Sequence, residues 1–184
     1  TPTANEESFD DVTGADVIPG GTGGNNMFHY SNGSLMDGLT VSASYTPSDG
    51  TTQVESSSDY GLKYTGIEGL TIGAGAGEDN SAAASIDLTN MYVTYTMDAF
   101  SVGYQASEAD SETANADKDF QAIGLSYAVS EDLSVSINSS TIEFENSSLS
   151  DQEATGFGIS YTMGSMTLAG THNSVDNVAG TSTS

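Results

Sequence analysis

The sequence contains five pairs of short segments in which apolar and polar residues alternate, and a tight turn joins each pair. The clearest pair spans 88–97 and 100–106, with Asp98-Ala99 between them. A period of two predicts β-strands, and two strands joined by a tight turn predict an antiparallel hairpin. No segment has the helical period that could cover the apolar face of these strands. The sheet therefore requires an apolar environment outside the chain, and a lipid bilayer is the obvious candidate.

The connections alternate between short and long. Within a pair the turn is two to six residues, as at 33–38, whereas the segments between pairs are longer and acidic, at 47–59, 77–85, 107–119 and 146–152. Transmembrane barrels combine short periplasmic turns with long outer loops in this way. The pattern predicts about ten strands in up-and-down order over 26–174, preceded by an acidic, Gly-rich loop over 1–25 and followed by a truncated loop or tail over 175–184.

The polar face of the strands distinguishes a barrel from a sandwich. A β-sandwich also shows alternation, because each of its sheets buries one face and solvates the other. Solvated faces normally carry Lys, Glu and Arg, whereas here we expect Gly, Ser, Thr, Ala and one Lys, with nearly all carboxylates in loops. Small polar groups suit a narrow aqueous lumen. The sequence thus favours an all-β, antiparallel, up-and-down transmembrane β-barrel.

Composition excludes several classes of function. The chain has 26 acidic and 2 basic residues, a formal net charge of −24, so nucleic-acid binding is excluded because the cations that displace phosphate counterions are missing. With no Cys, two His and no G-x-S-x-G motif, an enzyme is not expected. There is no apolar run of transmembrane-helix length, no signal-peptide pattern and no initiator Met, which predicts a processed or partial chain.

Five tyrosines recur on the apolar face, each expected just before a short turn. They are Tyr30, Tyr64, Tyr95, Tyr127 and Tyr161. In a barrel, tyrosines at one depth form an aromatic girdle at the membrane interface. The alternative is ordinary cross-strand aromatic packing, and repetition in all five pairs favours the girdle.

The charged residues offer two interpretations. An acidic cluster precedes the first strand, at Glu6, Glu7, Asp10, Asp11 and Asp16. Carboxylates that line a pore attract cations, but such runs are usually solvated loops. His29 and Lys63 have the polar parity of their strands, which predicts lumen-facing positions. Lys63 would then face the acidic cluster across the pore, although both side chains are equally compatible with simple solvation.

The most specific residue order lies between residues 13 and 49. It runs Gly14-x-Asp16-x-Ile18-Pro19, then Asn25-Asn26, Phe28-x-Tyr30 and Gly38-Leu39-Thr40-Val41-Ser42-Ala43-Ser44-Tyr45. This order resembles the general diffusion porins of alphaproteobacteria, and the resemblance of hairpin architecture extends to about residue 173. It implies a Gram-negative outer-membrane porin, a homotrimer in outer-membrane lipid, with a water-filled channel for ions and small hydrophilic solutes.

The resemblance also implies how the chain is divided. Residues 1–25 would be part of the loop that narrows the pore, with its carboxylates making the channel cation-preferring. The strands would be about ten of an expected sixteen. The chain departs from the family pattern because the first strands and the final strand with its terminal aromatic are missing, which predicts a fragment of a longer polypeptide.

Calcium is the one cofactor that the residues suggest. The segments 78–80 and 108–112 and Asp49 offer carboxylate oxygens, which Ca²⁺ prefers, but none matches an EF-hand. An alternative function is therefore a soluble or cell-surface β-rich structural or adhesive protein with calcium in its acidic loops. No other cofactor is expected.

Overall fold

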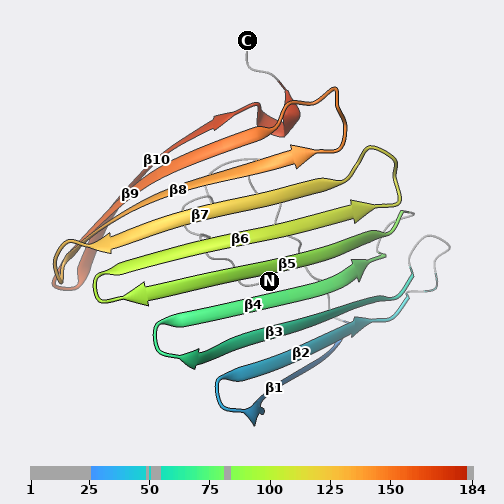
Figure 1. Cartoon of the computed structure of the whole chain (residues 1–184), viewed down its shortest axis with the longest axis horizontal. Helices are drawn as coiled ribbons and strands as arrows, with labels where there is room; N and C mark the ends of the chain where they lie inside the picture. Colours follow the sequence, from blue (N-terminus) through green and yellow to red (C-terminus); the bar gives the residue numbers. More distant parts are fainter. Residues whose placement is uncertain (1–25, 49, 51–54, 81–83, 182–184) are drawn as a thin grey trace.

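The computed structural model describes residues 26–48, 50, 55–80 and 84–181. They form one antiparallel sheet of ten strands, in which each strand pairs with its neighbours in sequence (Figure 1). The strands are β1 (Phe28–Met36), β2 (Leu39–Thr46), β3 (Ser57–Ile67), β4 (Leu70–Asp79), β5 (Ile86–Met97), β6 (Phe100–Ser111), β7 (Lys118–Ala128), β8 (Leu133–Phe144), β9 (Gln152–Met163) and β10 (Met166–Asp176), followed by a 3₁₀ turn, η1 (Val178–Gly180). The predicted all-β, up-and-down architecture is confirmed.

The strands are long enough to cross a bilayer. They contain 8 to 12 residues, and a tilted transmembrane strand needs about 9–11 residues. Within the part of the chain that the structure describes, no helix has the length and apolar character needed to cross a membrane.

The short turns continue the hydrogen-bond ladder of the sheet. In four of them, a carbonyl of the turn accepts a hydrogen bond from a backbone N–H near the end of the next hairpin's first strand. The pairs are Thr65 to Gly38 (2.7 Å), Thr96 to Gly69, Ala128 to Ala99 and Thr162 to Asp132 (2.8 Å each). Neighbouring hairpins are thus joined up to their turns. The predicted turn Asp98-Ala99 is confirmed, with Asp98 at a φ of 51°.

Several strands extend further than the alternation of apolar residues indicates. β6 continues to Ser111 and β9 begins at Gln152, because backbone pairing persists where polar residues replace the apolar ones. The predicted turn at 33–38 is wrong, since β1 runs to Met36 through a register shift after Asn32 and the turn is only Asp37-Gly38. β10 reaches Asp176, two residues beyond the expected end of the hairpins.

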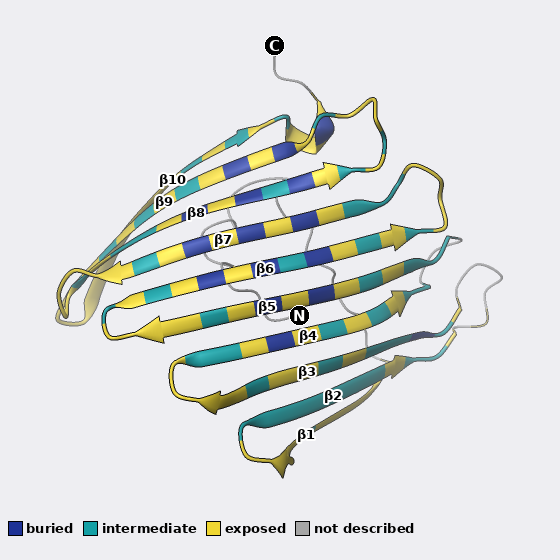
Figure 2. Cartoon of the chain, in the orientation of Figure 1, coloured by how far each residue is buried: buried dark blue, intermediate teal, exposed yellow. Residues whose placement is uncertain are grey.

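The sheet has an inner and an outer face, and we define them by Tyr92 and Tyr95. The face of Tyr95 carries the predicted apolar alternation, and many of its large side chains are exposed by 36% to 75%, while others such as Val41 and Tyr64 are half-buried (Figure 2). They include Phe28, Tyr60, Leu62, Met91, Val93, Val102, Ile123, Leu125, Ile137, Ile159 and Leu168. An apolar surface that recurs on so many neighbouring strands is larger than a typical soluble monomer presents.

The inner face holds a small apolar cluster at its long-loop end. Phe120, Ala122, Ile142 and Ala154 are buried there, and Phe144 and Val175 pack against them. The expectation that this face holds only Gly, Ser, Thr, Ala and one Lys is therefore wrong. The physical reason is that the two faces exchange character near the long loops, where the outer positions become acidic and the inner ones apolar.

Candidate functional site

The inner face of β5–β10 is the candidate functional site, and we call it the inner wall. Strand register brings its small polar residues into rows. One row joins Ser101, Ser126 and Ser136 across β6, β7 and β8, and continues to Gly158 and Thr171. The wall is therefore lined by hydroxyl groups and by bare backbone.

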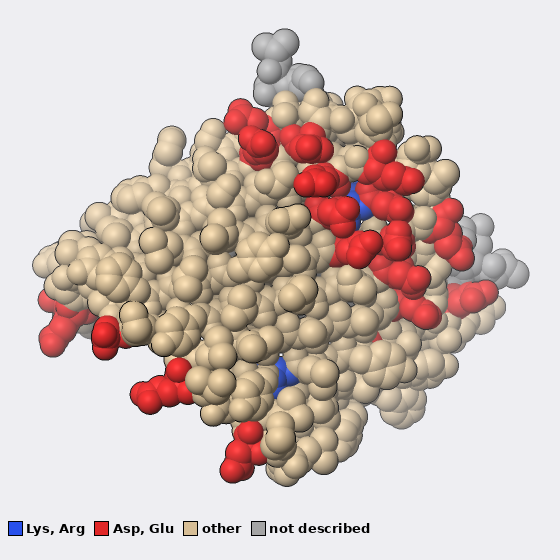
Figure 3. All heavy atoms as spheres, viewed as in Figure 1, with Lys and Arg blue, Asp and Glu red and all other residues tan. Residues whose placement is uncertain are grey.

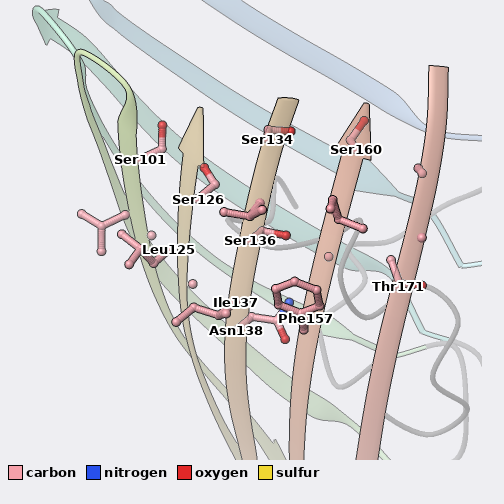
Figure 4. Close-up of a pocket in the computed structure, with 18 of the residues that line it drawn as sticks. Ser101, Leu125, Ser126, Ser134, Ser136, Ile137, Asn138, Phe157, Ser160 and Thr171 are labelled. Atoms are coloured by element: carbon pink, nitrogen blue, oxygen red, sulfur yellow. The ribbon is translucent and has the colours of Figure 1, made fainter. Parts of the chain in front are cut away.

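A second row combines glycines with two amides. Gly103, Gly124, Asn138, Gly156 and Asn173 are successive register partners from β6 to β10. Around these two rows the wall is hollowed, with a volume of about 630 Å³, and Ser126, Ser136, Ser160 and Asn138 line the hollow (Figure 4). The missing side chains of the glycines create this space.

The buried polar side chains of the described residues are uncharged. They are Ser57, Asn90, Gln105, Ser107, Asn138, Ser140 and Gln152. Asn90 and Asn138 are 5% and 7% exposed, and both atoms of each amide have no hydrogen-bond partner in the described structure. A buried amide without a partner is costly. Asn138 lines the hollow whereas Asn90 does not, so Asn138 is the amide at which a polar molecule in the hollow would be favoured.

Charge is scarce on the inner face. Among the described residues, strand parity places Asp59, Lys63, Asp79 and Lys118 there, and only Lys118 belongs to β5–β10. The hydroxyl of Ser44 donates a hydrogen bond to Oδ2 of Asp59 (3.0 Å), and Lys118 Nζ lies 6.0 Å from the ring centroid of Phe144. The inner face thus carries two Lys rather than the one expected, with two carboxylates near its long-loop end.

Most carboxylates of the strands lie on the outer face at the long-loop end, rather than in loops as expected. Register places Glu78 beside Asp87 and Asp110, and Glu108 beside Asp119 and Glu143. Figure 3 shows this acidic band at one end of a broad surface that is mostly uncharged, with smaller acidic groups at the opposite edge. On β6 the apolar positions end at Ala106, so Glu108 and Asp110 lie beyond the apolar surface.

Asp110 is the most perturbed group in the acidic band. A hydrogen bond with the side chain of Asp117, together with the negative charges of Asp117, Glu108 and Asp87, favours the protonated form and raises the pKa of Asp110. The carboxylate of Asp117 also accepts a hydrogen bond from the backbone N–H of Ser111 (2.8 Å). Like charges in adjacent strands repel each other, so repulsion between the carboxylates of this band destabilises the folded sheet when they are ionised.

The predicted girdle tyrosines all lie on the outer face, at unequal depths. Tyr64, Tyr95, Tyr127 and Tyr161 lie within three residues of the strand end at a short turn, whereas Tyr30 lies six residues before Met36. Tyr127 stacks on Phe100, with ring centroids 4.4 Å apart and an interplanar angle of 27°. Cross-strand packing therefore accounts for part of this pattern, and the interfacial role stays a prediction.

The structure brings His29 and Lys63 to the same sheet face as the inner wall. His29 is paired with Ser44, and Lys63 is paired with Thr40 and Gly73. The acidic cluster Glu6, Glu7, Asp10, Asp11 and Asp16 lies outside the described residues, so its role in a constriction stays a prediction.

Calcium binding also stays a prediction. Among the described residues, no group of three His, Cys, Asp or Glu side chains is arranged to hold a metal ion. Asp49 lies outside the described residues. Glu78 and Glu108 are on the outer face, whereas Asp79 is on the inner face, so the predicted ligands of these segments do not converge.

Sequence reasoning missed the amides of the inner wall. Asn90 and Asn138 have the polar parity, and Asn138 sits between serines in a strand of otherwise simple alternation. An Asn at an inward position was a detectable signal. What alternation cannot give is the identity of the cross-strand neighbours, such as Gly124 and Gly156, which flank Asn138 and offer its amide no side-chain partner.

Comparison with known proteins agrees with this architecture. Two solved structures similar in fold are an anion-selective porin from Comamonas acidovorans (TM-score 0.75, 12% identity, 84% of this chain and 49% of that one) and OmpT, an outer membrane protein of Vibrio cholerae (TM-score 0.64, 16% identity, 82% and 53%). A third is a porin refined at 1.8 Å (TM-score 0.62, 19% identity, 86% and 61%). The chain thus spans roughly half the length of these porins. A comparison with curated proteins found no match.

The family itself follows from the sequence match. The family model described as Gram-negative porin matches residues 3–180, nearly the whole chain. This agrees with the bacterial outer-membrane location predicted from the sequence, and it leaves the alternative of an adhesive surface protein without support. The chain belongs to the Gram-negative porin family.

Proposed function

We propose that the chain forms most of the wall of an outer-membrane diffusion channel, which passes ions and small hydrophilic solutes and prefers cations. We further propose that the protein is a general porin of alphaproteobacterial type. In this proposal the chain supplies about ten of the sixteen strands of the barrel, and the full protein is a homotrimer. Diffusion requires no catalytic group, and we propose no enzymatic activity.

One observation carries the proposal, namely the opposite character of the two sheet faces. The outer face exposes large apolar side chains on neighbouring strands, as at Met91, Val102 and Leu125, whereas the inner wall is lined by hydroxyls, amides and glycines. Lipid is the solvent that suits the first surface and water the solvent that suits the second. A sheet that separates the two is the wall of an aqueous pore.

Cation preference is supported by the balance of charge. The 26 acidic and 2 basic residues give the chain a strongly negative field, which concentrates cations and repels anions at the mouths of a channel. The similar porin named as anion-selective is 12% identical to this chain, a likeness that concerns the fold and carries no information on selectivity.

The direct test uses the full-length protein, purified in detergent and reconstituted in planar bilayers. We expect conductance that rises in steps as single channels insert. Under a KCl gradient, the reversal potential should have the sign expected for a channel that is more permeable to K⁺ than to Cl⁻. Folded, detergent-resistant protein that gives no conductance would contradict the channel function. A reversal potential set by Cl⁻ would contradict only the cation preference.

The oligomeric state is tested on the same preparation. Light scattering or crosslinking of the detergent complex is expected to give three copies. A monomer under conditions where the channel conducts would contradict the trimer and leave the channel intact.

A further inference from the structure

We propose that the inner wall around Asn138 is a weak binding subsite for uncharged, polyhydroxylated solutes, of the chemical class of small sugars and polyols. The inference rests on the proposed channel function, because it concerns a solute that moves along the lumen side of the sheet. It adds a preferred solute class to a channel that would otherwise discriminate only by size and charge.

The subsite is the hollow in the inner wall, which has a volume of about 630 Å³. It is lined by residues of β5 to β10, both small polar ones and apolar ones such as Val102, Ile137 and Phe157. Ligand pockets commonly have volumes of about 300–1,000 Å³. Figure 4 shows the side chains of Ser126, Ser136 and Ser160 on neighbouring strands along it, with Asn138 beside them. Each hydroxyl can both donate and accept a hydrogen bond, which is the pattern that a row of sugar hydroxyls presents.

Asn138 is the residue of the hollow whose side-chain hydrogen-bonding groups are left unsatisfied. Its side chain is 7% exposed, yet neither the oxygen nor the nitrogen of its amide has a hydrogen-bond partner in the described structure. Leaving a buried polar group unpaired costs more than a made hydrogen bond gains. A solute with neighbouring hydroxyl groups can accept from the amide nitrogen and donate to the amide oxygen at the same time.

Gly156 lets the amide lie across the wall. Asn138 Oδ1 and Asn173 Oδ1 lie 2.5 Å and 2.6 Å from the point that a Cβ at Gly156 would occupy, and Asn138 Nδ2 lies 3.0 Å from it. Asn173 is not a hydrogen-bond partner of Asn138 in the described structure, so both ends of the Asn138 amide remain unsatisfied.

The charge distribution selects a neutral ligand. The hollow has no Asp, Glu, Lys or Arg among its lining residues, and in the described strands β5–β10 the charged inner side chain, Lys118, lies at the long-loop end. A charged solute would lose hydration there without gaining a counter-charge, whereas hydroxyl groups exchange water for equivalent partners.

The test measures block of the reconstituted full-length channel by maltotriose, with poly(ethylene glycol) of similar hydrodynamic size as the control for size. We expect maltotriose to reduce conductance in a saturable way, while the polymer reduces it only in proportion to its effect on bulk conductivity. Asn138→Ala should raise the half-blocking concentration about five- to tenfold, the loss of one to two hydrogen bonds.

A matched variant separates the subsite from a general effect on the wall. Asn90→Ala removes another buried amide without a partner from the inner face, 5% exposed, but Asn90 does not line the hollow. It should keep the half-blocking concentration of the unmodified channel. Gly156→Ala should weaken block while retaining Asn138, because the added methyl displaces the amide.

The outcomes distinguish this inference from the channel proposal. Normal conductance with no saturable block, or equal effects of Asn138→Ala and Asn90→Ala, would overturn the subsite and leave the channel intact. Absence of any conductance from the folded protein would overturn both. The subsite would be established if block by maltotriose saturates, is weakened by Asn138→Ala and by Gly156→Ala, and is unchanged by Asn90→Ala.

Discussion

Single residues at the short turns and in the acidic band set the local limits of this fold. Gly38 and Gly69 adopt φ of +76° and +74°, a region that favours glycine, and both lie against the backbone of the next hairpin. At the opposite end of the strands, Asp110 lies among other carboxylates. At Gly38 and Gly69 the backbone therefore limits which side chain is possible. At Asp110 the neighbouring carboxylates limit the pH range in which the protein is most stable.

Gly69→Ala tests the close approach of one turn to the next hairpin. A Cβ there would lie 2.1 Å from the carbonyl oxygen of Thr96, in addition to the strain of a positive φ. We expect a loss of stability of about 2–4 kcal/mol, seen as a lower midpoint in heat-dependent migration on SDS gels. Gly164→Ala is the matched control, because Gly164 has a φ of +59° and nothing within 4 Å of its added methyl. It should lose only about 1–2 kcal/mol, and equal losses in the two variants would contradict the role of the contact.

Asp110→Asn tests the electrostatic repulsion within the acidic band. Because the pKa of Asp110 is raised in the folded state, the folded protein favours the protonated carboxyl, and this stabilisation is present at low pH and lost as the pH rises through the raised pKa. Asn resembles the protonated acid, so the variant should melt at a higher temperature than the unmodified protein at pH 7. At about pH 3 and below, where free carboxyls are largely protonated, the difference should vanish.

The control for this pH dependence removes a carboxylate from the other end of the sheet. Asp98→Asn changes the charge by the same amount at a short turn, where the φ of 51° suits Asn. It should not reproduce the pH-dependent gain. If both variants gave the same gain, the effect would arise from net charge rather than from the neighbours of Asp110.

Each strand is the element that separates lipid from water, and β7 shows this most simply. Leu125 is on the outer face and 41% exposed, whereas its neighbour Ser126 is on the inner face. Successive side chains of a strand point to opposite faces. The environment of a residue in this sheet therefore changes completely with a step of one position.

The pair Leu125→Lys and Ser126→Lys tests this separation. A lysine on the lipid face costs about 2–4 kcal/mol at the bilayer midplane and less toward the interfaces. Leu125 lies three residues from the end of β7, so Leu125→Lys should cost part of this energy and lower the yield of folded protein and its thermal midpoint. Ser126→Lys places the same charge in the lumen, so the protein should fold and the reversal potential should shift toward that of Cl⁻. Opposite outcomes would mean that the two faces are assigned the wrong way round.

The whole molecule combines a neutral inner wall with strongly acidic ends. The two carboxylates on the inner face of the described residues, Asp59 and Asp79, belong to β3 and β4, while the largest acidic group of the outer face gathers at the long loops (Figure 3). Within the part of the chain that the structure describes, the charge that supports the proposed cation preference therefore acts through long-range fields at the mouths, rather than through a line of charges along β5–β10.

Salt dependence tests this origin of selectivity. Screening shortens the reach of charge from about 10 Å at 0.1 M to about 3 Å at 1 M ionic strength. We expect the ratio of K⁺ to Cl⁻ permeability, from reversal potentials at a fixed concentration ratio, to fall steeply as total KCl rises over this range. A ratio that does not change with salt would indicate charges in close contact with the permeating ion instead.

Much of the fold was predictable because it depends on local alternation. Apolar residues at every second position, as from Met91 to Met97, assign each side chain to a face whatever the neighbours are. Strand ends were harder to predict, since pairing continues through polar residues such as those before Ser111. The turn at 33–38 was predicted wrongly because β1 continues through an irregular register to Met36.

The sequence alone determined the β-hairpin order, the existence of an apolar face that needs lipid, and the acidic character of the protein. The tertiary structure decided which residues meet across strands: that Asn138 faces Gly156, that Asp110 faces other acids, and that Phe120 and Ile142 share a cluster on the inner face. The physical reason is that alternation is a property of one strand, whereas a hollow, an unpaired amide or a charge repulsion arises only from the register between strands.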